Sequence, residues 1–296
     1  MDNGEWKMTD QAENLRRKMG VSFSYRKSQA KTIAVISGKG GVGKSNFALN
    51  FSLELINRDK KVVIVDLDVG MGNINILLGL QPKRTIVDLF NDQLSIFEIL
   101  EKGPRNLSYI AGGTGLSQFI TMGDQQKEFF FEQYRQLVEV YDYIIFDMGA
   151  GVTEESLYFI LAADECITIT TGEPTSITDA YSMIKQVVIN GGEMPIHVIL
   201  NRARSRNEWS GLKQFQQVVQ QFLQIRVHPL GIIPEDKNVT EAVIRQIPYI
   251  LLNKKAPSAK SLRQLTDNYL INSDEIQLTY QPAFLDRFKN LLRGKI

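Results

Sequence analysis

A glycine-rich loop between a short apolar strand and a helix constrains the fold of this chain more than any other feature. Residues 32–46 read TIAVISGKGGVGKSN, in which an apolar run is followed by four glycines within six residues. Residues 38–45 match the phosphate-binding pattern G-x-x-x-x-G-K-[ST] in full. Backbone N–H groups of such a loop can surround a phosphate, Lys44 can reach the β- and γ-phosphates, and the Ser45 hydroxyl can bind Mg²⁺. The pattern therefore predicts a strand, a phosphate loop and a helix whose N-terminus attracts anions.

Apolar runs and helical stretches continue to alternate along the chain. We expect further strands at residues 61–66, 107–110, 143–147, 166–170, 196–201 and 230–233. We expect helices at residues 47–57, 125–140, 154–162, 175–190, 211–224 and 258–269. This order predicts an α/β fold with a doubly wound, mostly parallel sheet flanked by helices, and ligands at the carboxyl ends of the strands.

Length and composition limit the class of protein. A chain of 296 residues suits one large α/β domain, and its net charge of +1 provides no global field for binding nucleic acid. The single cysteine, Cys166, excludes an intramolecular disulfide and, like His197 and His228, lies in an apolar run that favours a structural position. No stretch approaches 18 continuous apolar residues, so we expect a cytosolic protein.

Acidic residues end two of the expected strands. Asp66 and Asp68 lie in VIVDLDVG, and Asp147 ends the run YIIFD, which has the form of a second-shell magnesium ligand. Gly149 and Gly151 would let the following loop approach a γ-phosphate. A simple turn is the alternative for Asp66 and Asp68, but their position beside a phosphate loop favours a nucleotide site.

A second lysine in the loop, Lys39, directly follows the first glycine. The loop thus reads K-G-G-x-G-K-[ST] and resembles the deviant phosphate loop of the MinD/ParA family of ATPases. The resemblance implies an ATP/ADP site with Mg²⁺, in which Lys39 reaches the nucleotide of a dimer partner. It also implies that Asp68 positions the attacking water and that Asp66 helps to organise Mg²⁺.

Later segments resemble the adenine-binding and dimer-contacting parts of the same family. The N-R pair and the P-E-D element, which follow two of the expected strands, correspond to the two adenine loops, and an Asn amide can both donate to and accept from an adenine edge. The implied nucleotide-binding residues are Gly38, Lys39, Gly40, Gly41, Val42, Gly43, Lys44, Ser45, Asn46, Asn201, Arg202, Pro234, Glu235 and Asp236. The implied catalytic residues are Lys39, Lys44 and Asp68, the metal-site residues Ser45, Asp66 and Asp147, and the dimer contacts Lys39, Glu173 and Asp179.

The C-terminal segment has an apolar helical face with basic residues beside it. Residues 282–296 read PAFLDRFKNLLRGKI, with Phe284, Leu285, Phe288, Leu291 and Leu292 on one face and the basic residues Arg287 and Lys289 among them. This pattern predicts a helix that lies in an anionic membrane surface, and a terminal helix packed on the domain is the alternative. Two such helices in a dimer would bind more tightly than one.

The N-terminal segment decides which branch of the family the chain resembles. Within residues 1–31, DQAENLR resembles the activating motif of FlhG (also called YlxH), a MinD-like ATPase of flagellar placement. The resemblance implies that Asp10, Gln11, Ala12, Leu15 and Arg16 contact the SRP-type GTPase FlhF and stimulate its GTP hydrolysis. It further implies flagellar C-ring components as partners, and a location at the inner face of the cell membrane.

The expected organisation is an N-terminal extension (1–31), a MinD-like ATPase domain (32–272) and a membrane-targeting helix (282–296). Three other functions remain open at this stage. A cell-division MinD would not need residues 1–31, and a ParA-type partitioning ATPase would bind DNA through basic patches that the near-zero net charge disfavours. A scaffold that binds nucleotide without hydrolysis would not need Asp68 and Asp147.

Overall fold

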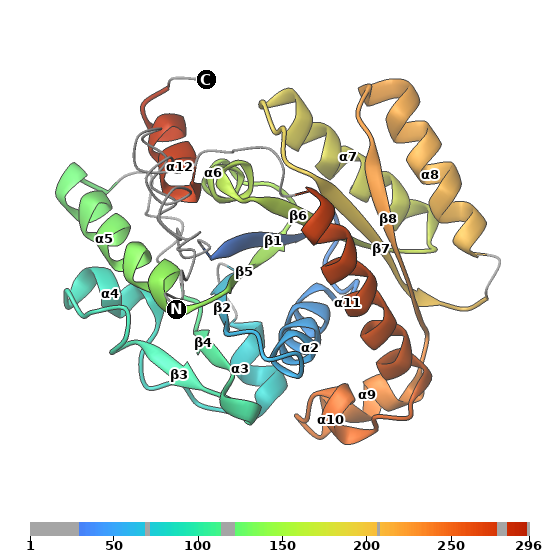
Figure 1. The fold of residues 1–296 in the computed structure, drawn as a ribbon, viewed down its shortest axis with the longest axis horizontal. Helices are drawn as coiled ribbons and strands as arrows, with labels where there is room; N and C mark the ends of the chain where they lie inside the picture. Colours follow the sequence, from blue (N-terminus) through green and yellow to red (C-terminus); the bar gives the residue numbers. More distant parts are fainter. Residues whose placement is uncertain (1–29, 69–71, 114–121, 206–207, 277–282, 295–296) are drawn as a thin grey trace, which may run out of the picture.

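One eight-stranded sheet with helices on both faces forms the molecule (Figure 1). The computed structural model describes residues 30–68, 72–113, 122–205, 208–276 and 283–294. The strands are β1 (Lys31–Ser37), β2 (Val62–Leu67), β3 (Leu100–Lys102), β4 (Ser108–Ile110), β5 (Tyr143–Ala150), β6 (Glu165–Thr171), β7 (Ile196–Ala203) and β8 (Val227–Pro234). Their order is β3-β4-β2-β5-β1-β6-β7-β8, and of the pairings only β3 with β4 is antiparallel.

The helices that the structure describes are α2 (Lys44–Ile56), α3 (Asn73–Leu78), α4 (Ile86–Asn91), η1 (Pro104–Asn106), α5 (Asp124–Val140), α6 (Glu154–Ala162), α7 (Pro174–Ile189), α8 (Glu208–Leu223), α9 (Lys237–Ile244), α10 (Tyr249–Leu252), α11 (Pro257–Ile276) and α12 (Phe284–Leu292). All the strands and helices expected from the sequence are present. The short elements β3, α3, α4, α9 and α10 were not predicted, because a few residues show no clear periodicity.

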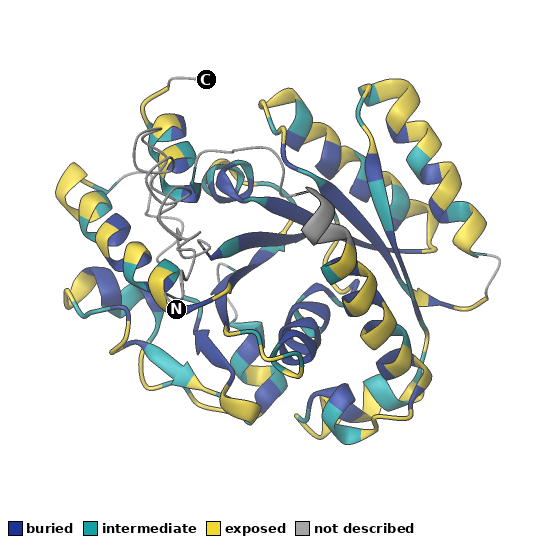
Figure 2. Cartoon of the chain, viewed as in Figure 1, coloured by how far each residue is buried: buried dark blue, intermediate teal, exposed yellow. Residues whose placement is uncertain are grey.

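Alternate residues of the central strands face two separate cores. In β1, Ile33 and Val35 pack in the core beneath α2, α10 and α11, whereas Ala34 and Ile36 pack in the core beneath α5, α6, α7 and α12. Figure 2 shows the central strands in the dark blue of buried residues. Burial on both faces explains why these strands read as continuous apolar runs.

Helix α2, which follows the phosphate loop, is buried on nearly every side. Phe47, Leu49, Phe51 and Leu53 are all at most 2% exposed, although a helix with one core-facing stripe would expose some of these positions. The helix expected after the phosphate loop, which we predict from the sequence as an amphipathic helix over residues 47–57, is therefore not amphipathic in its burial, because α3, α10 and α11 all contact α2. The phosphate loop therefore rests on an element that has little freedom to move.

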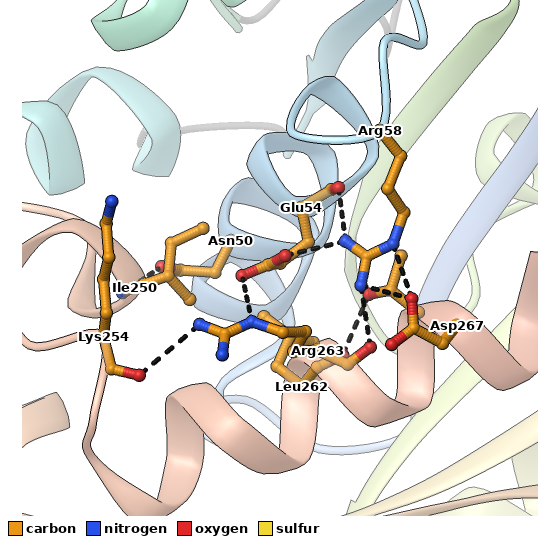
Figure 3. Close-up of polar contacts among 9 residues, drawn as sticks. Asn50, Glu54, Arg58, Ile250, Lys254, Leu262, Arg263 and Asp267 are labelled. Carbon is orange, nitrogen blue, oxygen red and sulfur yellow. Dashed lines mark hydrogen bonds and ion pairs between the residues drawn. The ribbon is translucent and has the colours of Figure 1, made fainter.

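Charged side chains join the end of α2 to α11, as Figure 3 shows. The Arg58 guanidinium donates to the Glu54 carboxylate (2.7 Å), to Asp267 Oδ1 (2.8 Å) and to the Arg263 carbonyl (3.0 Å). Arg263 also lies 4.0 Å from Glu54, which is buried. Since a buried carboxylate is stable only when it is paired, this network fixes α11 against α2.

Helix α12 packs against the domain, on the face that carries α5 and α6. Its residues Phe284, Phe288 and Leu291 are buried, and Phe288 is 0% exposed. The surrounding rings are Phe130, Phe131, Tyr134, Phe146 and Phe159. In this structure the apolar face expected to meet a membrane is thus covered by the protein, because α5, α6 and β5 supply an aromatic pocket that the sequence of α12 alone does not reveal.

Two of the basic residues of α12 are paired with the domain. Arg287 forms an ion pair with Asp164 and donates to the Ala162 carbonyl at 2.8 Å. Lys289 pairs with Glu128 at 2.9 Å and lies over the Phe131 ring. Among the described residues, no helix is long and apolar enough to cross a membrane.

Candidate nucleotide site

The phosphate loop joins the carboxyl end of β1 to the first turn of α2. Gly41 and Gly43 have φ values of 76° and 93°, a left-handed backbone that side chains disfavour. Gly38 has a different reason to be glycine, because a Cβ there would lie 2.1 Å from the backbone oxygen of Asp179 in α7. The loop is thus shaped by its own turns and by close packing of α7.

Lys44 lies inside the loop and pairs with the carboxylate predicted at the end of β5. Its Nζ is 2.7 Å from Asp147 Oδ1, and both side chains are buried. Burial raises the pKa of Asp147 above its ordinary value, and the Lys44 and Ser45 side chains oppose this rise. Within the described residues, Asp147 Oδ2 has no hydrogen-bond partner. A buried carboxylate oxygen beside a serine hydroxyl fits the oxygen-ligand chemistry of Mg²⁺.

Asp66 lies beside Asp147 in the sheet, and its carboxylate organises the residues that follow β2. The two aspartates are directly paired in register. Asp66 accepts hydrogen bonds from the backbone N–H groups of Asp68, Asn73 and Ile74 at 2.8–3.2 Å. Burial, with the nearby charge of Asp147, raises the pKa of Asp66 to about 7. Asp66 therefore lies beside Asp147 and holds the start of α3.

Asp68 lies at the same edge of the sheet and is partly exposed. Its Oδ2 accepts a hydrogen bond of 2.7 Å from the Asn73 amide, and its Oδ1 lies beside Gly149, where a Cβ would be 3.4 Å away. The structure thus brings Lys44, Asp66, Asp68 and Asp147 together around the phosphate loop.

A pocket of about 370 Å³ opens next to the loop and has the size of a small-molecule site. The residues that line it are Gly43, Asn46, Phe47, Asn201, Arg202, Ile233, Pro234, Glu235, Asp236, Val239, Thr240, Val243, Ile244 and Tyr249. Asn201 donates to the Val42 carbonyl at 2.8 Å, which ties the end of β7 to the loop. The two segments expected to contact adenine therefore face one cavity.

Comparison with known proteins agrees with this geometry. A family model for the CobQ/CobB/MinD/ParA nucleotide binding domain matches residues 33–249. The chain belongs to this family. Antiactivator FleN of Pseudomonas aeruginosa is 32% identical over 73% of this chain and 78% of that protein. The flagellum site-determining protein YlxH of Helicobacter pylori is 29% identical over 85% of this chain and 86% of that protein.

Solved structures of MinD proteins share the fold. A chain of the MinC:MinD cell division protein complex of Aquifex aeolicus superposes with a TM-score of 0.68 at 22% identity, covering 86% of this chain and all of that one. MinD of Pyrococcus horikoshii, solved with Mg-ADP, gives a TM-score of 0.64 at 23% identity, covering 84% of this chain and all of that one. The predicted MinD/ParA-like fold is confirmed.

The second lysine of this MinD/ParA loop, Lys39, contacts residues at the start of α7 in the same chain. Its Nζ lies 3.3 Å from Glu173 Oε2 and 3.4 Å from the Thr175 hydroxyl, at the start of α7. Both charged side chains are substantially exposed, so the pair is weak and can be exchanged for another anion. Lys39 and Glu173, both predicted dimer contacts, therefore lie together on the surface beside the loop.

The P-E-D element of this MinD/ParA protein lines the pocket, but its acidic side chains have other partners. Asp236 caps α9 through Asn238 and accepts two hydrogen bonds from Ser258 of α11. Glu235 pairs with Arg204 at 3.1 Å. Asp236 thus shapes the pocket by fixing α9 and α11. The contact with α11 depends on Ser258, which lies 22 positions away in the sequence.

The sequence motifs missed several residues of the site. Phe47, Val239 and Tyr249 line the pocket, and Asn73 contacts Asp68. In the sequence, Phe47 and Val239 are indicated only by their place in helices that begin beside recognised motifs. The predicted partner-binding residues Asp10, Gln11, Ala12, Leu15 and Arg16 lie outside the described residues.

Proposed function

We propose that this MinD/ParA family member is an ATPase that acts as a dimerisation switch. The observation that carries the proposal is the meeting of Lys39, Lys44 and Asp68 at one phosphate loop, beside a cavity of small-molecule size. Phosphoryl transfer depends mainly on positioning and on charge neutralisation, for which lysines and a water-orienting carboxylate suffice.

Each charged residue has a distinct task in this proposal. Lys44 would leave its pair with Asp147 to contact the β- and γ-phosphates, and Asp68 would orient the attacking water. Ser45 would hold Mg²⁺ with Asp66 and Asp147 close by, and the bound ion would neutralise phosphate charge. Asn201, Arg202 and the segment Pro234 to Asp236 would surround the adenine.

Dimerisation would follow from the exposed position of Lys39. In the dimer, this ammonium would exchange Glu173 of its own chain for the phosphates of the partner's nucleotide, with Glu173 and Asp179 near the interface. A phosphate group carries more charge than one carboxylate, and the exposed Lys39–Glu173 pair is easily broken.

Membrane association would require α12 to leave its aromatic pocket. Phe284, Phe288 and Leu291 would then enter an anionic bilayer surface, and Arg287 and Lys289 would exchange Asp164 and Glu128 for lipid phosphates. One released helix binds weakly, whereas the two helices of a dimer act together. The protein would thus cycle between a cytoplasmic monomer and a dimer at the inner face of the membrane.

The biological output would be the number and placement of flagella. FleN and YlxH among the relatives, and the DQAENLR segment, support this assignment, with FlhF and C-ring components as partners. The similarity to a Helicobacter pylori MinD, 31% identical over 81% of this chain, supports cell-division placement as the alternative. A ParA-type partitioning ATPase would share the same site chemistry.

Turnover of ATP tests the enzymatic part. The wild type, with Mg²⁺ and vesicles of anionic phospholipid, should release phosphate, and Asp68→Ala should lower kcat by about 100-fold while still binding ATP. A wild type that binds ATP without releasing phosphate would instead make the protein a nucleotide-binding scaffold.

Stimulation of FlhF tests the flagellar part. A peptide of residues 1–31 should accelerate GTP hydrolysis by FlhF, and a peptide in which Gln11 is replaced by alanine should not. If neither peptide accelerates hydrolysis, cell-division placement becomes the better assignment.

A further inference from the structure

Asn73 belongs to none of the recognised motifs, yet its side chain holds the carboxylate proposed to orient the attacking water. Its Nδ2 donates to Asp68 Oδ2 at 2.7 Å. We propose that Asn73 is a positioning residue that sets the orientation of Asp68 for hydrolysis. This inference rests on the proposed ATPase function and assigns a further residue to that site.

The backbone of Asn73 is fixed independently of its side chain. Asn73 is the first residue of α3, and Gly72 before it provides no side-chain cap for the helix. Asp66 Oδ2 accepts the N–H groups of Asn73 (2.8 Å) and Ile74 (3.2 Å) instead. Ile74 is 0% exposed in the core beneath α2. A buried carboxylate and a buried apolar side chain therefore hold the position from which the amide reaches Asp68.

Asp68 needs such a partner because it lies just beyond the end of strand β2. It follows the end of β2 and is partly exposed, so that solvent would otherwise allow its side chain to change rotamer. With Oδ2 bound by Asn73, the other oxygen, Oδ1, is directed toward Gly149, where no side chain fills the space.

The same contacts link Asp68 to the metal-site carboxylates. Asp66 holds the backbone of Asn73 as well as the N–H of Asp68 (3.1 Å), and Asp66 is paired in register with Asp147. A purely structural task for Asn73, as the first residue of a short helix, is the competing explanation.

Three variants separate these explanations: Asn73→Ala, Asn73→Asp and, as a matched control, Asn75→Ala in the same helix. The measurements are kcat at saturating Mg-ATP with anionic phospholipid vesicles, the ATP dissociation constant and the melting temperature. Asn73→Ala should lower kcat by about tenfold and change ATP affinity by less than about twofold, because a charge-assisted hydrogen bond is lost away from the bound phosphates. Asn75→Ala should keep the wild-type kcat.

Asn73→Asp is the discriminating variant. A negative residue in the first turn favours a helix, so a structural task predicts wild-type kcat in this variant. The positioning task predicts a loss at least as large as that of Asn73→Ala, because the added carboxylate cannot donate and repels Asp68. Wild-type or raised kcat in both Asn73 variants, or an equal loss in Asn75→Ala, would overturn the inference. A wild type without turnover would instead overturn the proposed function itself.

Discussion

At the scale of single residues, buried charges in this protein are compensated by partners from distant segments. Glu165, at the amino end of β6, is buried, and its carboxylate contacts Lys31 Nζ at 2.6 Å and the Tyr269 hydroxyl at 2.7 Å. The His197 ring lies 3.7 Å away. Burial acts to raise the pKa of Glu165, but His197 and Lys31 outweigh it and lower the pKa to about 2. The ionised form of Glu165 therefore stabilises the fold.

This lowered pKa predicts how stability depends on pH. The folded-state pKa of about 2 lies below the ordinary value of 4.5, so the stabilisation is complete above pH 4.5 and is lost as pH falls toward 2. Glu165→Gln should lower the free energy of unfolding by about 3 kcal/mol at pH 7, with a difference that shrinks below pH 4.5. Urea unfolding at several pH values measures this difference. Glu241→Gln, at an exposed pair with Arg245, should change little, and a pH-independent deficit for Glu165→Gln would contradict the assignment.

At the scale of elements, α12 shows how one amphipathic sequence fits two environments. Its apolar face fills the aromatic pocket of α5, α6 and β5, and its basic residues pair with acids at the pocket rim. The same features suit an anionic lipid surface. Under the proposed membrane cycle, the position of α12 would depend on the balance between these protein contacts and lipid contacts.

Weakening the protein contacts should shift this balance toward lipid without altering α12. Asp164→Asn removes the charge opposite Arg287 but leaves an oxygen that can accept the Thr32 N–H. Binding of the nucleotide-free protein to anionic vesicles should rise about fivefold, which corresponds to about 1 kcal/mol. Vesicle sedimentation measures the bound fraction. Glu132→Gln, at an exposed pair within α5, is the control, and equal binding by both variants and wild type would argue against release of α12.

At the scale of the whole molecule, the candidate nucleotide site and the contact of α12 with Asp164 lie at opposite ends of the strands. The phosphate loop follows the carboxyl end of β1, whereas Asp164 precedes the amino end of β6. Lys39 lies on the surface next to the loop, where a second copy could contact it. Under the proposed function, assembly of two chains is a simpler link between nucleotide and membrane than movement within the doubly covered sheet.

Loss of the Lys39 ammonium should therefore weaken dimer assembly more than it weakens ATP binding by the monomer. Lys39→Ala should weaken ATP-dependent dimerisation at least about tenfold, while ATP affinity of the monomer changes less than about twofold. Sedimentation velocity with ATP, in the Asp68→Ala background to prevent hydrolysis, reports the dimer fraction. Lys185→Ala, at an exposed position of α7, serves as control. Equal loss of dimerisation and ATP binding would refute a cross-dimer contact.

The local signals in the sequence were sufficient for the phosphate loop, the strand-end aspartates and the central strands. Gly41 and Gly43 are needed by the turn itself, and the apolar runs of β1 and β2 follow from burial on both sheet faces. The two segments expected to contact adenine line one pocket, and Asp236 accepts hydrogen bonds from Ser258. Short elements such as α3 were not predicted, and Asn73, the first residue of α3, was missed for the same reason.

The sequence by itself determined the chemistry of the loop and the class of fold, because both depend on spacing between near neighbours. Only the tertiary structure decided that α2 is buried on nearly every side, that Glu165 is paired with Lys31, and that the face of α12 is buried. These outcomes depend on contacts between residues more than 100 positions apart, such as Lys31 with Glu165 and Arg287 with Asp164. The hydrophobic pattern and the helix or strand propensity of a segment indicate which of its residues can be buried. Which other segment covers those residues is decided by packing in the folded protein.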